Sequence, residues 1–146
     1  MSNDDCAPSS LLEVRGCRLW RLPTIVDSRG RLTVAELATM PFPVKRLFFI
    51  ADVPAGETRG HDAQGTTKEL LLALGGSLLV TLDDGTRKQD VTLSGRGEGV
   101  FVAPKTWCVL SRFSPGAVLA VFASQPYDEA DQIRDYAEFL SIVAGG

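Results

Sequence analysis

Short apolar runs alternate with turn residues along most of the chain, at intervals of about ten residues. Gly, Pro, Asp and Ser separate the runs, and Asp83-Asp84-Gly85 is typical of a tight hairpin turn. This rhythm of short strands is typical of an all-β sandwich or barrel. We expect strands over residues 17–22, 31–36, 45–51, 69–74, 77–82, 90–93, 100–103, 107–111 and 118–124.

The two ends of the chain follow other patterns. Residues 1–10 are polar and acidic, so we expect a flexible tail there and a single domain over residues 11–146. Near the C-terminus, apolar side chains recur three and four positions apart, which predicts an amphipathic helix over residues 128–143. Many short strands with one terminal helix predict a jelly roll, that is, a double-stranded β-helix.

Composition narrows the function classes. The 146 residues carry a net charge of -3, which argues against a nucleic-acid partner held by bulk electrostatics. No apolar run reaches the roughly 18 residues of a membrane span. The N-terminus has no basic start followed by an apolar block, and the three cysteines have no paired spacing. We therefore expect a cytoplasmic protein without disulfides or a zinc site.

The chain contains one histidine, His61, which excludes a metal centre built on several histidines of one chain. It lies in a polar stretch that leads into a buried strand. In an extended segment Asp62 and Gln64 would share one face, and His61 and Ala63 the other. The alternative is that all four are loop residues in water.

The spacing of this stretch resembles the first cupin motif. Gly56, Asp62, Gln64, Glu69 and Gly76 occupy the five motif positions. Asp62 and Gln64 stand where the motif has its two metal-binding histidines. Because transition-metal cupin sites need neutral imidazoles, we expect no metal and no cofactor.

A closer resemblance covers residues 19–139. It is carried by Asp27-Ser28-Arg29-Gly30, Lys45-Arg46, Arg59-Gly60, Pro104-x-x-Trp107 and, most specifically, Tyr127-Asp128-Glu129-x-Asp131-x-Ile133-Arg134-x-Tyr136-x-x-Phe139. These segments resemble the dTDP-sugar 3,4-ketoisomerases, also called WxcM-like cupins. The resemblance implies an RmlC-like cupin barrel, a homodimer, and a metal-free reaction that moves the keto group of a dTDP-4-keto-6-deoxyhexose from C4 to C3.

The chain departs from this family at the acid/base positions. Asp62 and Gln64 replace the family's His-x-His pair, and Cys108 replaces the histidine that follows the tryptophan. The family's tyrosine positions fall among Leu47, Phe48 and Phe49, which have no hydroxyl. His61 stands one place before the pair. The resemblance therefore predicts a divergent member without the catalytic pair.

Four residues are candidate catalytic groups. Asp62 is the leading base candidate because it stands on a catalytic position, and Glu69 could act as a base if it is buried. Arg59 could hold a phosphate or a carbonyl oxygen. The alternatives are surface ion pairs of Arg59 with Glu57 or Asp62, and of Glu69 with Lys68 or Arg59. His61 is a candidate only if the alignment shifts locally.

Candidate substrate-binding residues are Arg59, Gln64, Trp107, Cys108 and Phe49. For Trp107 the competing interpretation is packing in the core. For Cys108 it is an inert small apolar side chain, since no histidine is placed to activate the thiol.

Three functional hypotheses remain open at this point. The first is a metal-free enzyme that enolises a nucleotide-linked keto sugar or another keto substrate of a biosynthetic pathway, as an isomerase, cyclase or lyase. The second is a non-catalytic ligand-binding or regulatory pseudoenzyme. The third is an ordinary 3,4-ketoisomerase that uses His61.

Overall fold

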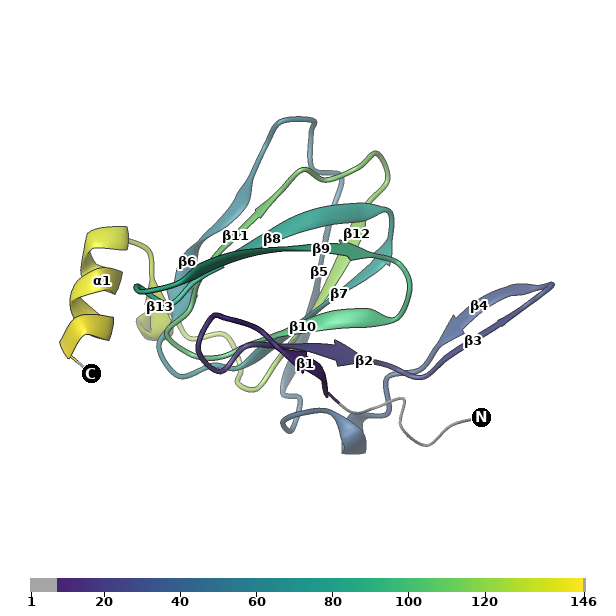
Figure 1. The fold of residues 1–146 in the computed structure, drawn as a ribbon, viewed down its shortest axis with the longest axis horizontal. Coiled ribbons are helices and arrows are strands. Elements are labelled where there is room, and N and C mark those ends of the chain that lie inside the picture. Colours follow the sequence, from purple (N-terminus) through teal and green to yellow (C-terminus); the bar gives the residue numbers. More distant parts are fainter. Residues whose placement is uncertain (1–7, 146) are drawn as a thin grey trace.

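Two antiparallel sheets pack face to face in the computed structural model, which describes residues 8–145 (Figure 1). The six-stranded sheet has the order β1 (Pro8–Leu11), β2 (Arg18–Arg21), β10 (Glu98–Val102), β7 (Glu69–Gly75), β12 (Val118–Ala123) and β5 (Arg46–Ala51). The five-stranded sheet has the order β13 (Gln132–Ile133), β6 (Arg59–Gln64), β11 (Trp107–Ser111), β8 (Ser77–Asp83) and β9 (Lys88–Ser94). The expected jelly roll is confirmed.

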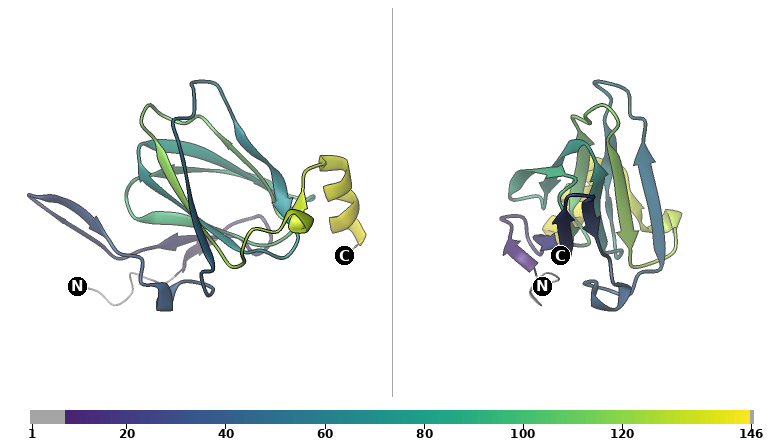
Figure 2. Two further views of the ribbon diagram at one scale, coloured as in Figure 1. Left: turned by 180° about the vertical axis from the view of Figure 1, so that it is seen from behind. Right: turned by 90° about the vertical axis from the view of Figure 1, so that its right-hand side faces the viewer.

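A hairpin, a helix and two 3-10 turns lie outside the two sheets. The hairpin of β3 (Thr24–Asp27) and β4 (Gly30–Thr33) projects from one end of the barrel (Figures 1 and 2). The helix α1 (Tyr136–Gly145) stands at the opposite end (Figure 2). Two 3-10 turns, η1 (Leu37–Thr39) and η2 (Glu129–Asp131), complete the chain.

The alternation of side chains in the strands creates two apolar layers. Leu71, Val80 and Leu119 are buried in the cluster between the sheets. Leu70 and Phe122 point to the other side of the six-stranded sheet, where they belong to a second buried cluster. This arrangement leaves the interior of the barrel mostly apolar, so any polar side chain that points inward is conspicuous.

The first ten residues are only partly as expected. Residues 1–7 of the predicted tail lie outside the described part of the chain. Residues 8–10 are not a tail, because Pro8–Leu11 form β1 and pair with β2 in antiparallel register. This pairing supplies hydrogen-bond partners to the edge of β2 that β10 does not use.

The C-terminal helix is shorter than predicted, since it begins at Tyr136 rather than at residue 128. The Asp128 side chain accepts a hydrogen bond from the Ala130 amide and begins a 3-10 turn. Gln132 and Ile133 then pair with β6 as β13. The Asp135 side chain caps α1 by accepting hydrogen bonds from the backbone amides of Ala137 and Glu138.

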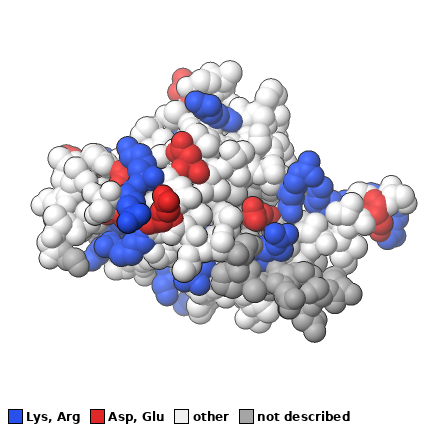
Figure 3. Space-filling view, viewed as in Figure 1, with Lys and Arg blue, Asp and Glu red and all other residues white. Residues whose placement is uncertain are grey.

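Aromatic side chains hold α1 against the barrel. Phe139 is fully buried, and the rings of Trp107 and Tyr136 lie 5.6 and 5.7 Å from its ring centre. The Tyr136 hydroxyl donates a hydrogen bond to Asp83 at the end of β8. On the face drawn in Figure 3, acidic and basic side chains are interspersed. Within residues 8–145, α1 and the other helical segments are too short or too polar to cross a membrane.

Candidate active site

A cavity of about 420 Å³ opens between the two sheets, and polar side chains from both of them line it. Arg46 comes from β5, Arg59, Asp62 and Gln64 from β6, and Glu69 from β7. The apolar side chains of Leu71, Leu110 and Val121 also line it. The cavity therefore combines several ionisable groups with apolar side chains.

A bulge in β6 brings Arg59 and Asp62 to the same cavity although they are three positions apart. Asp62 pairs with Cys108, whereas Gly60 pairs with the next residue, Val109. His61 is the extra residue, and its φ of 58° lies in the left-handed region. Gly60 also has a positive φ, and a Cβ there would lie 2.7 Å from the Cys108 carbonyl oxygen, so only glycine fits.

His61 does not line the cavity. Its side chain is exposed, and Nε2 lies 2.8 Å from the Thr58 hydroxyl in the loop before β6. The extra residue of a bulge is not paired, so its side chain does not follow the alternation between the inner and outer faces of the strand. The placement of His61 as a catalytic candidate is thus not supported by the geometry.

Glu69 and Arg46 lie on one row of the six-stranded sheet. Ala123 of β12 pairs with Glu69 on one side and with Arg46 on the other, so all three side chains point to the inner face. Burial, together with the nearby charge of Asp62, raises the pKa of Glu69 from 4.5 to about 7, and the charge of Arg46 opposes this shift. Glu69 is consequently a carboxyl group that exchanges its proton near neutral pH.

Asp62 faces Glu69 from the other sheet. Burial raises the pKa of Asp62, while the positive charges of Arg134 and His61 oppose the rise. Two carboxyl groups in one partly desolvated cavity resist simultaneous ionisation, because each negative charge disfavours the other. The pair can therefore hold one proton and one negative charge at the same time.

The ion pairs considered as alternatives are not seen among the described side chains. Within residues 8–145, Arg59 forms no ion pair with Glu57 or Asp62, and Glu69 forms none with Lys68 or Arg59. Arg59 is exposed. These groups remain available to a ligand.

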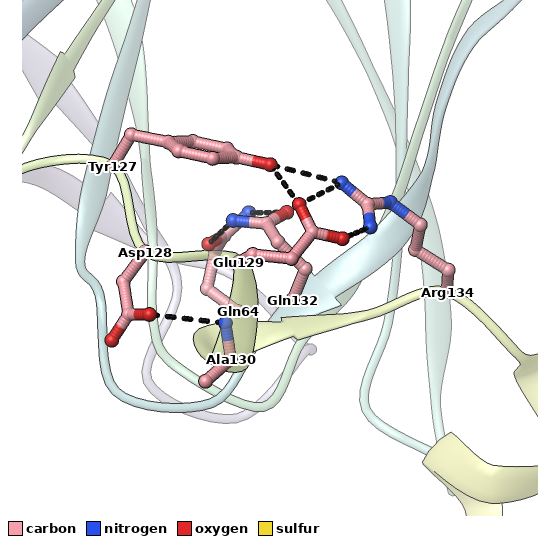
Figure 4. A network of polar contacts seen from close by, with 7 residues as sticks. All are labelled: Gln64, Tyr127, Asp128, Glu129, Ala130, Gln132 and Arg134. Carbon is pink, nitrogen blue, oxygen red and sulfur yellow. Dashed lines mark hydrogen bonds and ion pairs between the residues drawn. The ribbon is translucent and has the colours of Figure 1, made fainter.

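A polar network made by the C-terminal segment lies at one wall of the cavity (Figure 4). Glu129 accepts hydrogen bonds from the Tyr127 hydroxyl and from the guanidinium group of Arg134. Beside it, the side-chain amides of Gln64 and Gln132 exchange two hydrogen bonds of 3.1 and 2.7 Å. The network fixes the position of the Tyr127 ring and ties Gln64 to β13.

Two of the predicted substrate-binding residues lie elsewhere. Phe49 is 60% exposed on the outer face of β5, because alternation gives the inner position to Phe48. Trp107 is buried against Phe139 and Tyr136, so it holds α1 rather than a ligand. Cys108 and Gln64 do line the cavity.

Burial raises the pKa of the Cys108 thiol, and the negative charges of Glu69 and Asp62 raise it further. This keeps the sulfur as a neutral thiol. The two described cysteines, Cys17 and Cys108, are free. In the described part of the chain, the His, Cys, Asp and Glu side chains form no group of three or more that could hold a metal ion.

The cavity also contains residues that we did not single out from the sequence, namely Arg46, Tyr127, Gln132 and Arg134. Tyr127 and Arg134 belong to the specific C-terminal motif, Gln132 stands at one of its variable positions, and Arg46 belongs to the Lys45-Arg46 pair. Alternation along β5 would also have placed Arg46 on the same face as Phe48 and Ile50.

Known proteins share both the sequence and the fold. The family model described as FdtA: WxcM-like, C-terminal matches residues 15–144. The TDP-4-oxo-6-deoxy-alpha-D-glucose-3,4-oxoisomerase of Aneurinibacillus thermoaerophilus is 40% identical over 121 residues, which cover 82% of this chain and 87% of that protein.

Solved structures agree with this relationship. The QdtA 3,4-ketoisomerase of Thermoanaerobacterium thermosaccharolyticum, a double variant in complex with TDP, has a TM-score of 0.87 and 30% identity, covering 90% of this chain and 96% of that one. A 3,4-ketoisomerase from Helicobacter canadensis has a TM-score of 0.83 and 33% identity, covering 88% and 98%. The chain therefore belongs to the WxcM-like family of sugar 3,4-ketoisomerase enzymes.

Proposed function

We propose that this protein isomerises a TDP-linked 4-keto-6-deoxyhexose to the 3-keto sugar, with carboxyl groups as its acid and base. The main support is that Asp62 and Glu69 line one cavity and that burial raises the pKa of Glu69 to about 7. The Aneurinibacillus relative named above is a TDP-4-oxo-6-deoxyglucose 3,4-oxoisomerase, and one QdtA variant holds TDP-4-keto-6-deoxyglucose.

The environments of the two carboxyl groups assign their roles. Near neutral pH, Glu69 retains a proton in part of the molecules, whereas the positive charge of Arg134 opposes the rise in the pKa of Asp62 and favours its ionised form. Two carboxyl groups in unlike environments can supply one base and one acid. Asp62 is then the base and Glu69 the acid.

The reaction is a balanced transfer of protons. Asp62 takes the proton from C3, and the electrons of that bond form a C3–C4 double bond while the C4 oxygen becomes negative. The proton of the C3 hydroxyl passes to this oxygen, which leaves the negative charge on the C3 oxygen. Glu69 gives a proton to C4 as the C3 carbonyl forms, and solvent resets both carboxyl groups. No oxidant or reductant is needed.

Arg59 is suited to bind the diphosphate of the substrate, which lies outside the reacting sugar. It is exposed and lies at the beginning of β6. A guanidinium group binds phosphate oxygens through paired hydrogen bonds. We assign Arg59 to the diphosphate of the nucleotide, with Gln64 and Cys108 lining the cavity beside the sugar.

A homodimer is part of the proposal and is supported by the projecting hairpin. Val26 and Leu32 are 66% and 58% exposed on β3 and β4. A two-stranded hairpin alone in water is only marginally stable. A second copy of the chain would cover these side chains.

The test follows TDP-4-keto-6-deoxyglucose by NMR in the presence of the protein. We expect the 3-keto product, and we expect Asp62→Asn and Glu69→Gln each to slow its formation by about 100-fold or more. His61→Asn is the matched control, because asparagine tolerates the left-handed backbone and cannot act as a base. The control is expected to keep the wild-type rate.

Two outcomes would contradict the proposal. Saturable binding of the nucleotide sugar without any turnover would indicate a ligand-binding pseudoenzyme. Loss of the reaction in His61→Asn, with Asp62→Asn still active, would restore the ordinary histidine mechanism.

A further inference from the structure

Arg46 is a cation inside the cavity that has no anionic partner. Within residues 8–145 it forms no ion pair, and its Nε is buried without a hydrogen-bond partner. A buried donor of a charged group costs free energy when it is unsatisfied, so a ligand atom that accepts from it gains affinity. Arg46 lines the same cavity as Asp62 and Glu69.

Two aromatic rings hold the Arg46 side chain in place. Its guanidinium carbon lies 5.2 Å from the ring centre of Phe48 and 5.4 Å from that of Tyr127. Tyr127 is in turn held by the hydrogen bonds of Glu129 and Arg134 (Figure 4). A guanidinium group kept in one orientation loses little entropy when it binds, which is how a preorganised donor stabilises developing charge.

The row that contains Arg46 also contains the acid. Ala123 separates Arg46 from Glu69, so only a methyl group stands between the two longer side chains on this row. Arg46 is close enough to lower the pKa of Glu69, although no ion pair joins them. When a substrate carbon lies next to the Glu69 carboxyl group, the oxygen bonded to that carbon would therefore lie next to the Arg46 guanidinium group.

We propose that Arg46 is a catalytic residue that binds the enediolate oxygens on C3 and C4, next to the acid Glu69. The forked donors of guanidinium match two neighbouring oxygens, and the negative charge of the intermediate moves from one to the other. The inference rests on the proposed function. It gives Arg46 the carbonyl-oxygen role that the sequence offered to Arg59.

The experiment measures deuterium uptake from D₂O at the carbons next to the keto group of TDP-4-keto-6-deoxyglucose. We expect Arg46→Ala to lower the exchange rate by about 100- to 1,000-fold, the usual effect of removing one oxyanion donor. Binding of TDP, measured by calorimetry, is expected to persist because Arg46 contacts the sugar rather than the nucleotide. Added guanidinium ion should restore part of the exchange in Arg46→Ala.

The matched variant is Arg46→Lys, which keeps the charge but loses the fork. We expect it to lie between wild type and Arg46→Ala and to gain nothing from guanidinium. Wild-type exchange in Arg46→Ala, or a loss that guanidinium does not restore, would overturn the inference alone. Absence of exchange in the wild-type protein would overturn the proposed function and this inference together.

Discussion

Glu69 shows how one position in a sheet can tune a carboxyl group. The residue begins β7, where the next side chains are apolar and buried, and it points inward toward Asp62. Loss of water and the charge of Asp62 both favour the protonated form, while Arg46 favours the ionised form. Removing the charge of Asp62 should therefore lower the pKa of Glu69, and removing the charge of Arg46 should raise it.

The raised pKa of Glu69 makes the stability of the fold depend on pH. Between pH 4.5 and about 7 the folded protein holds this proton and the unfolded chain does not, so stability falls as pH rises. The shift corresponds to at most about 3 kcal/mol. Glu69→Gln should remove this dependence and make the protein more stable than wild type at pH 8.

Urea denaturation at pH 5 and pH 8 measures the effect. The carboxyl group of Asp27 provides a control, because Asp27→Asn changes an exposed ion pair with Arg29 far from the cavity. If Glu69→Gln loses stability between pH 5 and pH 8 as steeply as wild type, the raised pKa of Glu69 is contradicted.

At the scale of elements, the segment from Gly65 to Thr67 is shaped by Asp131. The buried Asp131 carboxylate accepts hydrogen bonds from the amides and hydroxyls of Thr66 and Thr67. The Gly65 amide donates to the Asp131 carbonyl oxygen at 2.8 Å. One aspartate thus fixes the connection between β6 and β7, and with it the approach of Asp62 to Glu69.

Asp131→Ala should destabilise the fold by about 3 kcal/mol, because it leaves buried donors without an acceptor. Asp128→Ala removes one exposed capping bond to Ala130 and should cost about 1 kcal/mol. Urea denaturation of both variants compares the two losses. Equal losses would show that Asp131 does not anchor the connection.

Local patterns predicted most strands, but β6 was not among them. The apolar runs over residues 45–51, 107–111 and 118–124 coincide with β5, β11 and β12 because their side chains alternate or pack on both faces. A period of two places Arg59 and Asp62 on opposite faces, and only the bulge at His61 unites them. A bulge depends on the partner strand, so the segment alone did not reveal it.

The same limit applies to the C-terminal segment. Its apolar spacing fits a helix from residue 128, yet Asp131 reaches back to Thr66 and Thr67, and Ile133 pairs with Ala63. These contacts join residues more than sixty positions apart. Asp62, Gln64, Glu69, Arg59 and Cys108 were nevertheless found from motif positions, and all five line the cavity.

At the scale of the whole molecule, the barrel separates its two ends. The helix α1 closes one end through Trp107 and Phe139, and the β3–β4 hairpin projects at the other (Figure 1). The cavity lies between the sheets and draws its ionisable groups from both of them. Relative movement of the sheets would therefore separate Asp62 from Glu69.

The proposed homodimer predicts how surface charges affect assembly. Val26→Asp with Leu32→Asp places charge on the exposed hairpin and should convert a dimer into a monomer. Leu140→Asp on α1, where the side chain is 37% exposed, is the matched control and should remain dimeric. Light scattering measures the mass of each form. A hairpin variant that stays dimeric would exclude this surface.

The central claim is that carboxyl groups carry the proton transfer in this member of the family. Its most direct test is the exchange of the C3 proton of TDP-4-keto-6-deoxyglucose in D₂O, compared between wild type and the double variant Asp62→Asn with Glu69→Gln. We predict rapid exchange in the wild-type protein and none above the uncatalysed rate in the double variant. Exchange at the wild-type rate in the double variant would contradict the account.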